Sequence, residues 1–196
     1  MSGLQIADAL TGKSAAVDNL NRLQVRSVSE PIQHWISHER GLSFQVLGET
    51  TLASGTVWPL FIKNTDTTNQ IVFTRIRHQV IDQAGGTAIP NVNNYLKMSF
   101  DTTYTSGGTA LTPANMHRGK ANSPVLLAYS GATLSTTNEI IADKWFTQLE
   151  ADMYVWDQEG SLILSPGQTL AFGYTGNQTS GLVSVRVSFV IMGPGE

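Results

Sequence analysis

Apolar and polar residues alternate along much of the chain, most clearly over residues 182–191. One face of this stretch is apolar and consists of Val183, Val185, Val187, Phe189 and Ile191. The opposite face carries Ser184, Arg186 and Ser188. Because the side chains of a β-strand point alternately to its two faces, this pattern predicts a half-buried strand with one solvated side, which is typical of antiparallel sheets.

A second long strand is predicted at residues 70–81, where the alternation places His78 on the same face as Ile76 and Val80. Shorter strands, separated by polar turns that mostly contain glycine, are predicted at residues 23–28, 43–47, 57–63, 95–100, 125–129, 161–164 and 169–174. Pro166-Gly167 lies between the last two and fits a type II turn, since Pro presets φ and Gly accepts a positive φ. The sequence therefore predicts a hairpin there.

One segment, residues 136–155, fits two patterns. Its start, Thr136-Thr137-Asn138-Glu139, has the form of a capping box, and Ile141, Trp145, Leu149 and Met153 follow at intervals of four, as on a helix face. From Lys144 onward, apolar and polar residues also alternate as in a strand. We favour a strand from about Lys144 because the rest of the chain has β character, and helix or strand stays open for residues 137–150.

The composition supports one β-rich domain. The length of 196 residues suits a single sandwich, and only 14% of the residues are charged, against about 25% in an average domain. Glycine contributes 18 residues and proline 7, and Thr, Ser and Asn are frequent, as in strands and turns. The expected fold class is all-β, with one antiparallel β-sandwich over residues 21–196.

Charge and cysteine content narrow the possible partners. The net charge is −3, which lacks the basic excess of a nucleic-acid-binding protein. No cysteine is present, which rules out disulfides, thiolate metal sites and a cysteine nucleophile. No apolar run reaches the roughly 18 residues of a membrane-spanning helix. We therefore expect no nucleic-acid partner and no membrane partner.

Residues 1–20 are small and polar, and their main apolar side chains are Leu4, Ile6 and Leu10. This segment is too short and too weakly patterned to form a core element. Two interpretations are open: a frayed terminus, or an extended N-terminal arm that is ordered on a neighbouring subunit. We favour the arm, with Leu4, Ile6 and Leu10 as its contact residues. Residues 1–8 also lack the basic start and apolar stretch of a secretion signal, which predicts synthesis in a cytoplasm without export by that route.

The titratable residues show no catalytic pattern. His34 and His38 have a spacing that could hold a metal on a helix, but their neighbours suit a strand or a packed loop. The acidic residues Glu150, Asp152, Asp157 and Glu159 could serve glycoside hydrolysis or calcium binding, although a solvated strand face explains them more simply. Neither a nucleophile elbow nor a P-loop occurs. We expect no enzyme, no metal and no cofactor.

The aromatic residues offer a binding alternative. Trp58 lies in an apolar run and is expected in the core, whereas Trp156, beside Asp157, is expected to be exposed. Together with Tyr154, Trp156 could form a flat platform for sugar rings. Trp156 and Tyr154 are therefore the candidate glycan contacts of a receptor-binding or carbohydrate-binding β-module, such as the tip of a tail fibre.

Several strand and turn patterns resemble virus proteins. Residues 162–172 (LILSPGQTLAF), a following Gly/Asn/Thr-rich loop and the long strand to Met192 resemble the last strands of viral jelly rolls. Residues 21–26 (NRLQVR), 39–44 (ERGLSF) and 60–64 (LFIKN) resemble virion structural proteins of tailed bacteriophages, of the head-decoration or cement type.

The resemblance implies a non-enzymatic jelly-roll-like subunit that binds and stabilises an assembled head. Its implied partners are the major capsid protein and copies of itself in a homotrimer. Its implied location is the capsid surface of the virion, after synthesis in the host bacterial cytoplasm. In this scheme Asn64 would be a loop residue that follows a buried strand.

Overall fold

The computed structural model of the chain describes residues 16–17, 23–24, 40–81, 95–136, 138–144, 153–176 and 180–193. The chain divides into two compact units, Met1–Pro31 and Ile32–Glu196. In the first unit, strand β1 (Ala16–Val17) pairs antiparallel with β2 (Leu23–Gln24). The proposed arm over residues 1–20 falls mostly outside the described residues and stays a prediction.

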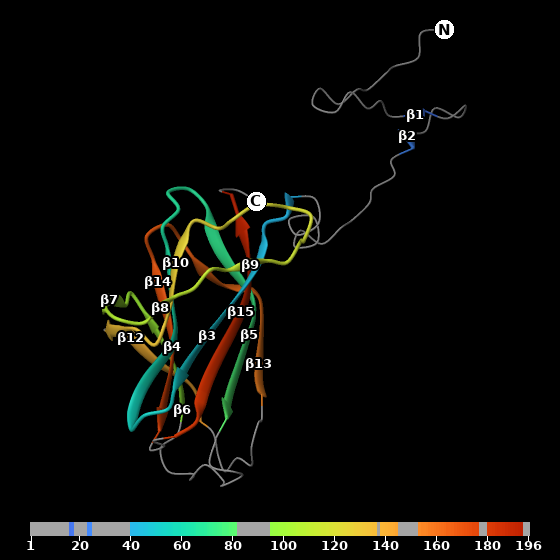
Figure 1. Ribbon diagram of the computed structural model, residues 1–196. Helices are drawn as coiled ribbons and strands as arrows, with labels where there is room; N and C mark the ends of the chain where they lie inside the picture. Colours follow the sequence, from blue (N-terminus) through green and yellow to red (C-terminus); the bar gives the residue numbers. More distant parts are fainter. Residues whose placement is uncertain are drawn as a thin grey trace. The chain divides into compact units, whose positions relative to one another are not determined.

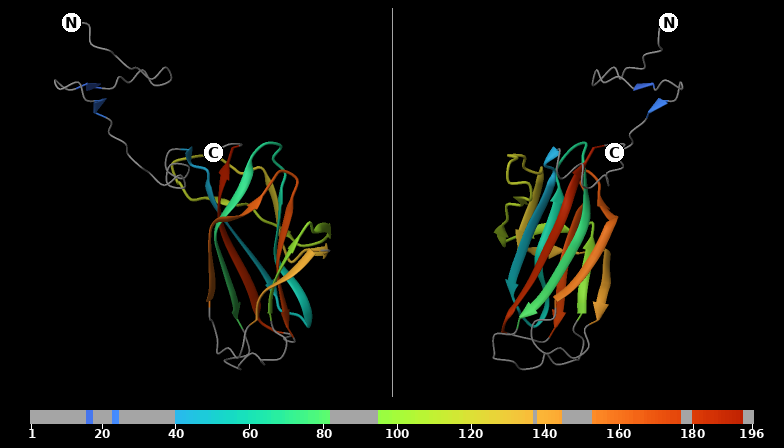
Figure 2. Two further views of the ribbon diagram at one scale, coloured as in Figure 1. Left: turned by 180° about the vertical axis from the view of Figure 1, so that it is seen from behind. Right: turned by 90° about the vertical axis from the view of Figure 1, so that its right-hand side faces the viewer.

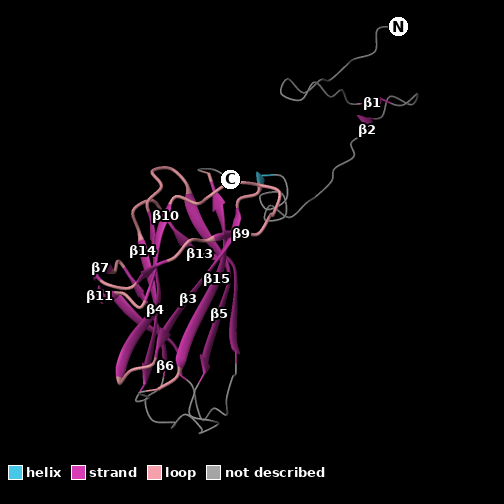
Figure 3. Ribbon diagram, in the orientation of Figure 1, coloured by secondary structure: helices cyan, strands magenta, loops and turns pink. Residues whose placement is uncertain are grey.

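The described part of the second unit consists mainly of strands and the loops between them (Figure 3). The five-stranded sheet has the order β13 (Met153–Leu164), β5 (Gln70–Ile81), β15 (Leu182–Met192), β3 (Ser43–Thr51) and β9 (Ala114–Asn115). The six-stranded sheet has the order β12 (Asn138–Lys144), β6 (Tyr95–Phe100), β14 (Thr169–Gly176), β4 (Gly55–Asn64), β10 (Leu126–Ser130) and β8 (Thr109–Ala110). A separate pair joins β7 (Thr103–Ser106) to β11 (Thr133–Ser135).

The two large sheets pack face to face as an antiparallel β-sandwich (Figures 1 and 2), which confirms the predicted all-β fold class. Residues of both sheets fill the main core between them, in which Phe44 and Phe189 of the five-stranded sheet are completely buried, and a smaller cluster around Tyr174 also joins the two sheets. Phe73 of that sheet meets Phe172 of the six-stranded sheet edge to face, with ring centroids 6.3 Å apart. Burial of these apolar faces drives the two sheets together.

The eight longest strands alternate between the sheets in a regular way. In chain order they are β3, β4, β5, β6, β12, β13, β14 and β15. The five-stranded sheet contains the first, eighth, third and sixth of them side by side, and the six-stranded sheet contains the second, seventh, fourth and fifth. Every connection crosses from one sheet to the other except that between the fourth and fifth, β6 and β12.

The connection from β6 to β12 is long and contains five short strands, β7 to β11. Three of them extend the sheets: β9 pairs with β3, β10 pairs with β4, and β8 pairs with β10. Since β3 and β4 would otherwise be edge strands, this insertion continues both sheets on one side of the sandwich. On the opposite side, β12 and β13 are the outermost described strands.

The turn at Pro166-Gly167 is confirmed, but the hairpin predicted around it is wrong. Gly167 has φ +81°, and the Gln168 amide donates to the Ser165 carbonyl over 3.1 Å. The strands on either side, β13 and β14, belong to different sheets, so they do not pair with each other. The turn therefore carries the chain across the sandwich.

Asn64 is the last residue of β4 and only 1% exposed, so its expected place in a loop is wrong. Its side-chain amide donates to the carbonyls of Asn69 and Leu164, and its side-chain oxygen accepts the Asp66 amide. These bonds tie the end of β4 to the following turn and to the end of β13. A buried amide with all these partners explains why a polar residue ends an apolar strand.

The ambiguous segment forms strand β12 over Asn138–Lys144, so the helix suggested by the capping-box pattern is wrong there. The strand pairs with β6, which shows that tertiary pairing overrides the local helix signal. Residues 145–152, including Trp145 and Leu149, lie outside the described residues.

His78 lies in the core, on the face of β5 that also carries Ile76 and Val80, as predicted. The residue is 4% exposed. Burial lowers the pKa of His78 to about 3, because the charged imidazolium would lose its hydration. The imidazole is therefore neutral in the folded protein throughout the mildly acidic range.

We expect the folded state to lose stability in acid because of His78. Below pH 6.5 the unfolded chain takes up a proton that the folded chain does not, so the free energy of unfolding falls by up to about 1.4 kcal/mol per pH unit. The variant His78→Leu should lack this contribution. Urea unfolding of both proteins between pH 5 and pH 7 measures the difference, and equal slopes would contradict the prediction.

Candidate functional site

A row of four side chains crosses the outer face of the five-stranded sheet. Val155, Arg77, Arg186 and Leu47 pair in register across the four neighbouring strands β13, β5, β15 and β3 (Figure 1). Each of the two arginines alternates with buried residues of its own strand, so both point away from the core. Val155 is 40% exposed and Leu47 is 37% exposed. Two cations at the middle of the sheet are therefore flanked on both sides by exposed apolar side chains.

The row places two like charges directly opposite each other, because Arg77 pairs with Arg186. Like charges directly opposite each other in a sheet repel. Within the described residues neither Arg77 nor Arg186 has a salt-bridge partner. Two acidic positions of the ladder lie one same-face row away: Glu49 pairs with Ser184, next to Arg186, and Asp157 pairs with Arg75, next to Arg77. The row that contains Asp157 also contains Arg75, which pairs with Ser188 on its other side.

An open pocket of about 490 Å³ lies on the outer face of the six-stranded sheet. Its floor consists of two cross-strand rows of β10, β4 and β14: Leu127, Lys63 and Thr169, and next to them Tyr129 and Phe61. The segment that follows β6 builds one wall with Asp101, Thr102, Thr103 and Tyr104. The turn before β14 adds Gly167 and Gln168. The insertion between β6 and β12 thus shapes the pocket.

The aromatic side of the pocket is fixed by contacts between its own side chains. The rings of Tyr104 and Tyr129 stack with centroids 4.5 Å apart and an angle of 21° between their planes. The ring of Phe61 lies 6.1 Å from that of Tyr104. The Tyr104 hydroxyl donates to the Gly107 carbonyl over 2.9 Å. These contacts hold the rings in place without a ligand.

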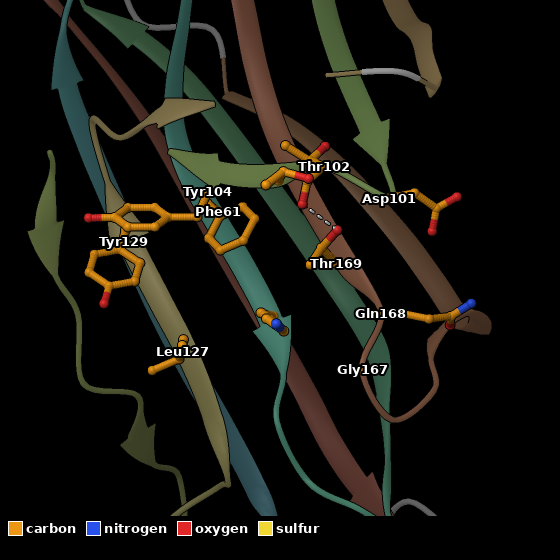
Figure 4. A pocket seen from close by; sticks show the side chains of 11 residues that line it. Phe61, Asp101, Thr102, Tyr104, Leu127, Tyr129, Gly167, Gln168 and Thr169 are labelled. Carbon is orange, nitrogen blue, oxygen red and sulfur yellow. Dashed lines mark hydrogen bonds between the residues drawn. The ribbon is translucent and has the colours of Figure 1, made fainter. Parts of the chain in front are cut away.

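Polar groups occupy the opposite side, as Figure 4 shows for Asp101 and Gln168. Asp101 has φ 55° in the tight turn between β6 and β7, and one of its carboxylate oxygens accepts the side-chain amide of Asn138. Thr169 donates its hydroxyl to the Thr102 carbonyl over 2.8 Å, a bond drawn as the dashed line in Figure 4. Lys63 is exposed. It has no ion-pair partner in the described parts of the chain.

The residues predicted as contacts from the sequence are not those of the pocket. Leu4, Ile6 and Leu10 lie outside the described residues, as do His34 and His38. Tyr154 and Trp156 belong to β13, where their backbones pair with His78 and Ile76, and their side chains lie outside the described part of the structure. The aromatic wall of the pocket comes instead from Tyr104 and Tyr129, which sequence reasoning missed.

Sequence reasoning also missed the arginine row, although Arg77 and Arg186 each alternate with apolar residues in the sequence.

Among the described residues, no group of three His, Asp or Glu side chains could hold a metal ion. No helix of the described residues is long and apolar enough to cross a membrane. Comparisons of the chain with protein families, with curated proteins and with solved structures find no match.

Proposed function

We propose that this chain is a non-enzymatic virion structural protein: a jelly-roll subunit that docks on an assembled bacteriophage capsid and reinforces it. The strand order supports the proposal. The first and eighth long strands lie side by side in one sheet, the second and seventh in the other, and one connection alone stays within a sheet. Jelly rolls are eight-stranded double sheets of two Greek keys, and capsid proteins use them often.

The outer face of the five-stranded sheet is the proposed contact with the capsid protein. Arginine is enriched in protein interfaces, and apolar side chains around it exclude water from the contact. Arg77 and Arg186 require carboxylates opposite them, so the partner surface is acidic. A two-fold contact of this face with a second copy would bring arginine against arginine, which argues for a different protein as the occupant.

The first test is the assembly state and the affinity for the particle. The molar mass of the full chain, measured by light scattering behind a sizing column, should be three times the 21.2 kDa of the monomer. The protein should also co-sediment with assembled capsids of the virus that encodes it, stripped of this protein, and protect them against heat. Failure to bind capsids would overturn the proposal.

Deletion of residues 1–20 is expected to leave folding intact and to abolish capsid binding. The described residues of this segment, 16–17, belong to the separate pair of β1 and β2, and Leu4, Ile6 and Leu10 can add weak contacts that act together by avidity. Co-sedimentation with capsids and thermal unfolding of the shortened chain measure the two effects. Undiminished capsid binding by the shortened chain would refute the role of the arm.

A further inference from the structure

We propose that the pocket on the outer face of the six-stranded sheet binds a saccharide ring. The proposal does not rest on capsid docking, because the pocket and the arginine row lie on different sheets. A volume of about 490 Å³ falls within the range of ligand sites, about 300 to 1,000 Å³.

The two sides of the pocket match the two sides of a sugar. A pyranose ring has apolar C–H faces and a rim of hydroxyl groups. In the pocket, Tyr104, Tyr129 and Leu127 lie on one side, and Asp101 and Gln168 lie on the other (Figure 4). Leu127 is 45% exposed and Tyr104 is 37% exposed, so the apolar side is open to a ligand. A sugar can place its C–H groups on the apolar side while its hydroxyls meet the polar side.

The hydrogen-bonding groups fit hydroxyls better than they fit a phosphate or an apolar molecule. Lys63 donates from the floor and Asp101 accepts at the wall, a combination that suits hydroxyl groups because each is both donor and acceptor. The carboxylate of Asp101 repels a phosphate, and Lys63 is the only cation among the residues that line the pocket. A wholly apolar ligand would use neither the donor on Lys63 nor the acceptor on Asp101.

The aromatic wall is rigid before the ligand arrives. The stack of Tyr104 on Tyr129 and the hydrogen bond from Tyr104 to Gly107 fix the ring positions. The two tyrosines therefore lose little conformational entropy when a ligand binds, which favours the affinity even for a small ligand.

The test is a glycan array probed with the full-length protein, followed by titration of the strongest free oligosaccharide by isothermal calorimetry. Tyr129→Ala and Lys63→Met should each weaken binding by about tenfold or more. The second variant guards against misfolding, because Lys63 is exposed while the ring of Tyr129 packs on Tyr104. Tyr95→Ala is the matched control, since Tyr95 is a half-buried tyrosine of β6 that does not line the pocket.

The outcomes separate the possibilities. Binding that is lost in both pocket variants and retained in the control supports the site. Absence of any signal from the unmodified protein on the array at about 100 µM, a concentration that detects sub-millimolar affinity, overturns the proposal. Glycan binding that is unchanged in Lys63→Met and Tyr129→Ala also overturns it, because the sugar would then bind elsewhere, such as at Tyr154 and Trp156.

Discussion

Replacing Phe189 by alanine is expected to lower the free energy of unfolding by about 3–5 kcal/mol. Phe189 is completely buried, and its ring stacks on Phe44 with centroids 5.8 Å apart and lies 6.2 Å from Phe73. It lies in β15, which is paired on both sides, so the backbone cannot move to fill the space that is left. The variant loses the transfer free energy of the ring and leaves a cavity. Urea unfolding followed by tryptophan fluorescence measures the loss.

Ile163→Ala is the control for this prediction. Ile163 is also a large apolar residue of the five-stranded sheet, but it lies in the outermost strand β13 and is 46% exposed. Its truncation should cost less than about 1 kcal/mol, because nearly half of the residue is already exposed to water and its removal leaves no closed cavity. Equal losses in the two variants would mean that the core does not lie between the two sheets.

The sequence predicted those features that depend on neighbouring residues. A strand at residues 182–191 and the faces of its side chains follow from period-two alternation, and both are confirmed by the buried Val183 and Phe189 and the exposed Arg186. The long strand at residues 70–81 and the buried position of His78 are confirmed for the same reason. Alternation of apolar and polar residues indicates which face of a strand each residue occupies, because the buried face requires apolar side chains.

Pairing partners could not be read in the same way. The turn chemistry of Pro166-Gly167 is local and was predicted correctly, but whether its flanking strands pair depends on strands far away in the chain. The capping-box pattern at residues 136–139 is also local, and the pairing of β12 with β6 overrides it. Register decides which residues meet across strands, and no local pattern contains it.

The candidate sites depend on this long-range information. Tyr104 and Tyr129 are separated along the chain and come together because β10 extends the six-stranded sheet while β7 belongs to a separate pair of strands in the same insertion. Arg77 and Arg186 are opposite each other because β5 and β15 are neighbours in a particular register. In the sequence, each of these residues resembles an ordinary surface or core residue. Neither the pocket nor the arginine row could therefore be predicted from the sequence.

The double variant Arg77→Glu/Arg186→Glu is expected to weaken capsid binding at least about 100-fold, because two attractive contacts with an acidic partner become repulsive. The salt dependence provides a second readout, since binding by the unmodified protein should weaken as ionic strength rises. The free energy of unfolding should change little, because both side chains point away from the core. The two glutamates of the variant repel each other about as much as the two arginines do. Co-sedimentation at two salt concentrations and urea unfolding measure these effects.

A matched control reverses two charges elsewhere. Arg118 and Lys120 are exposed and belong to the segment between β9 and β10, so Arg118→Glu/Lys120→Glu changes the net charge by the same amount without altering the arginine row. If the control variant loses as much affinity as the row variant, the capsid responds to net charge alone. If the control variant keeps its affinity and the row variant loses it, the contact lies on the outer face of the five-stranded sheet. The reason is that Arg77 and Arg186 lie opposite each other at the centre of four paired strands of that sheet, whereas the control residues lie outside this row.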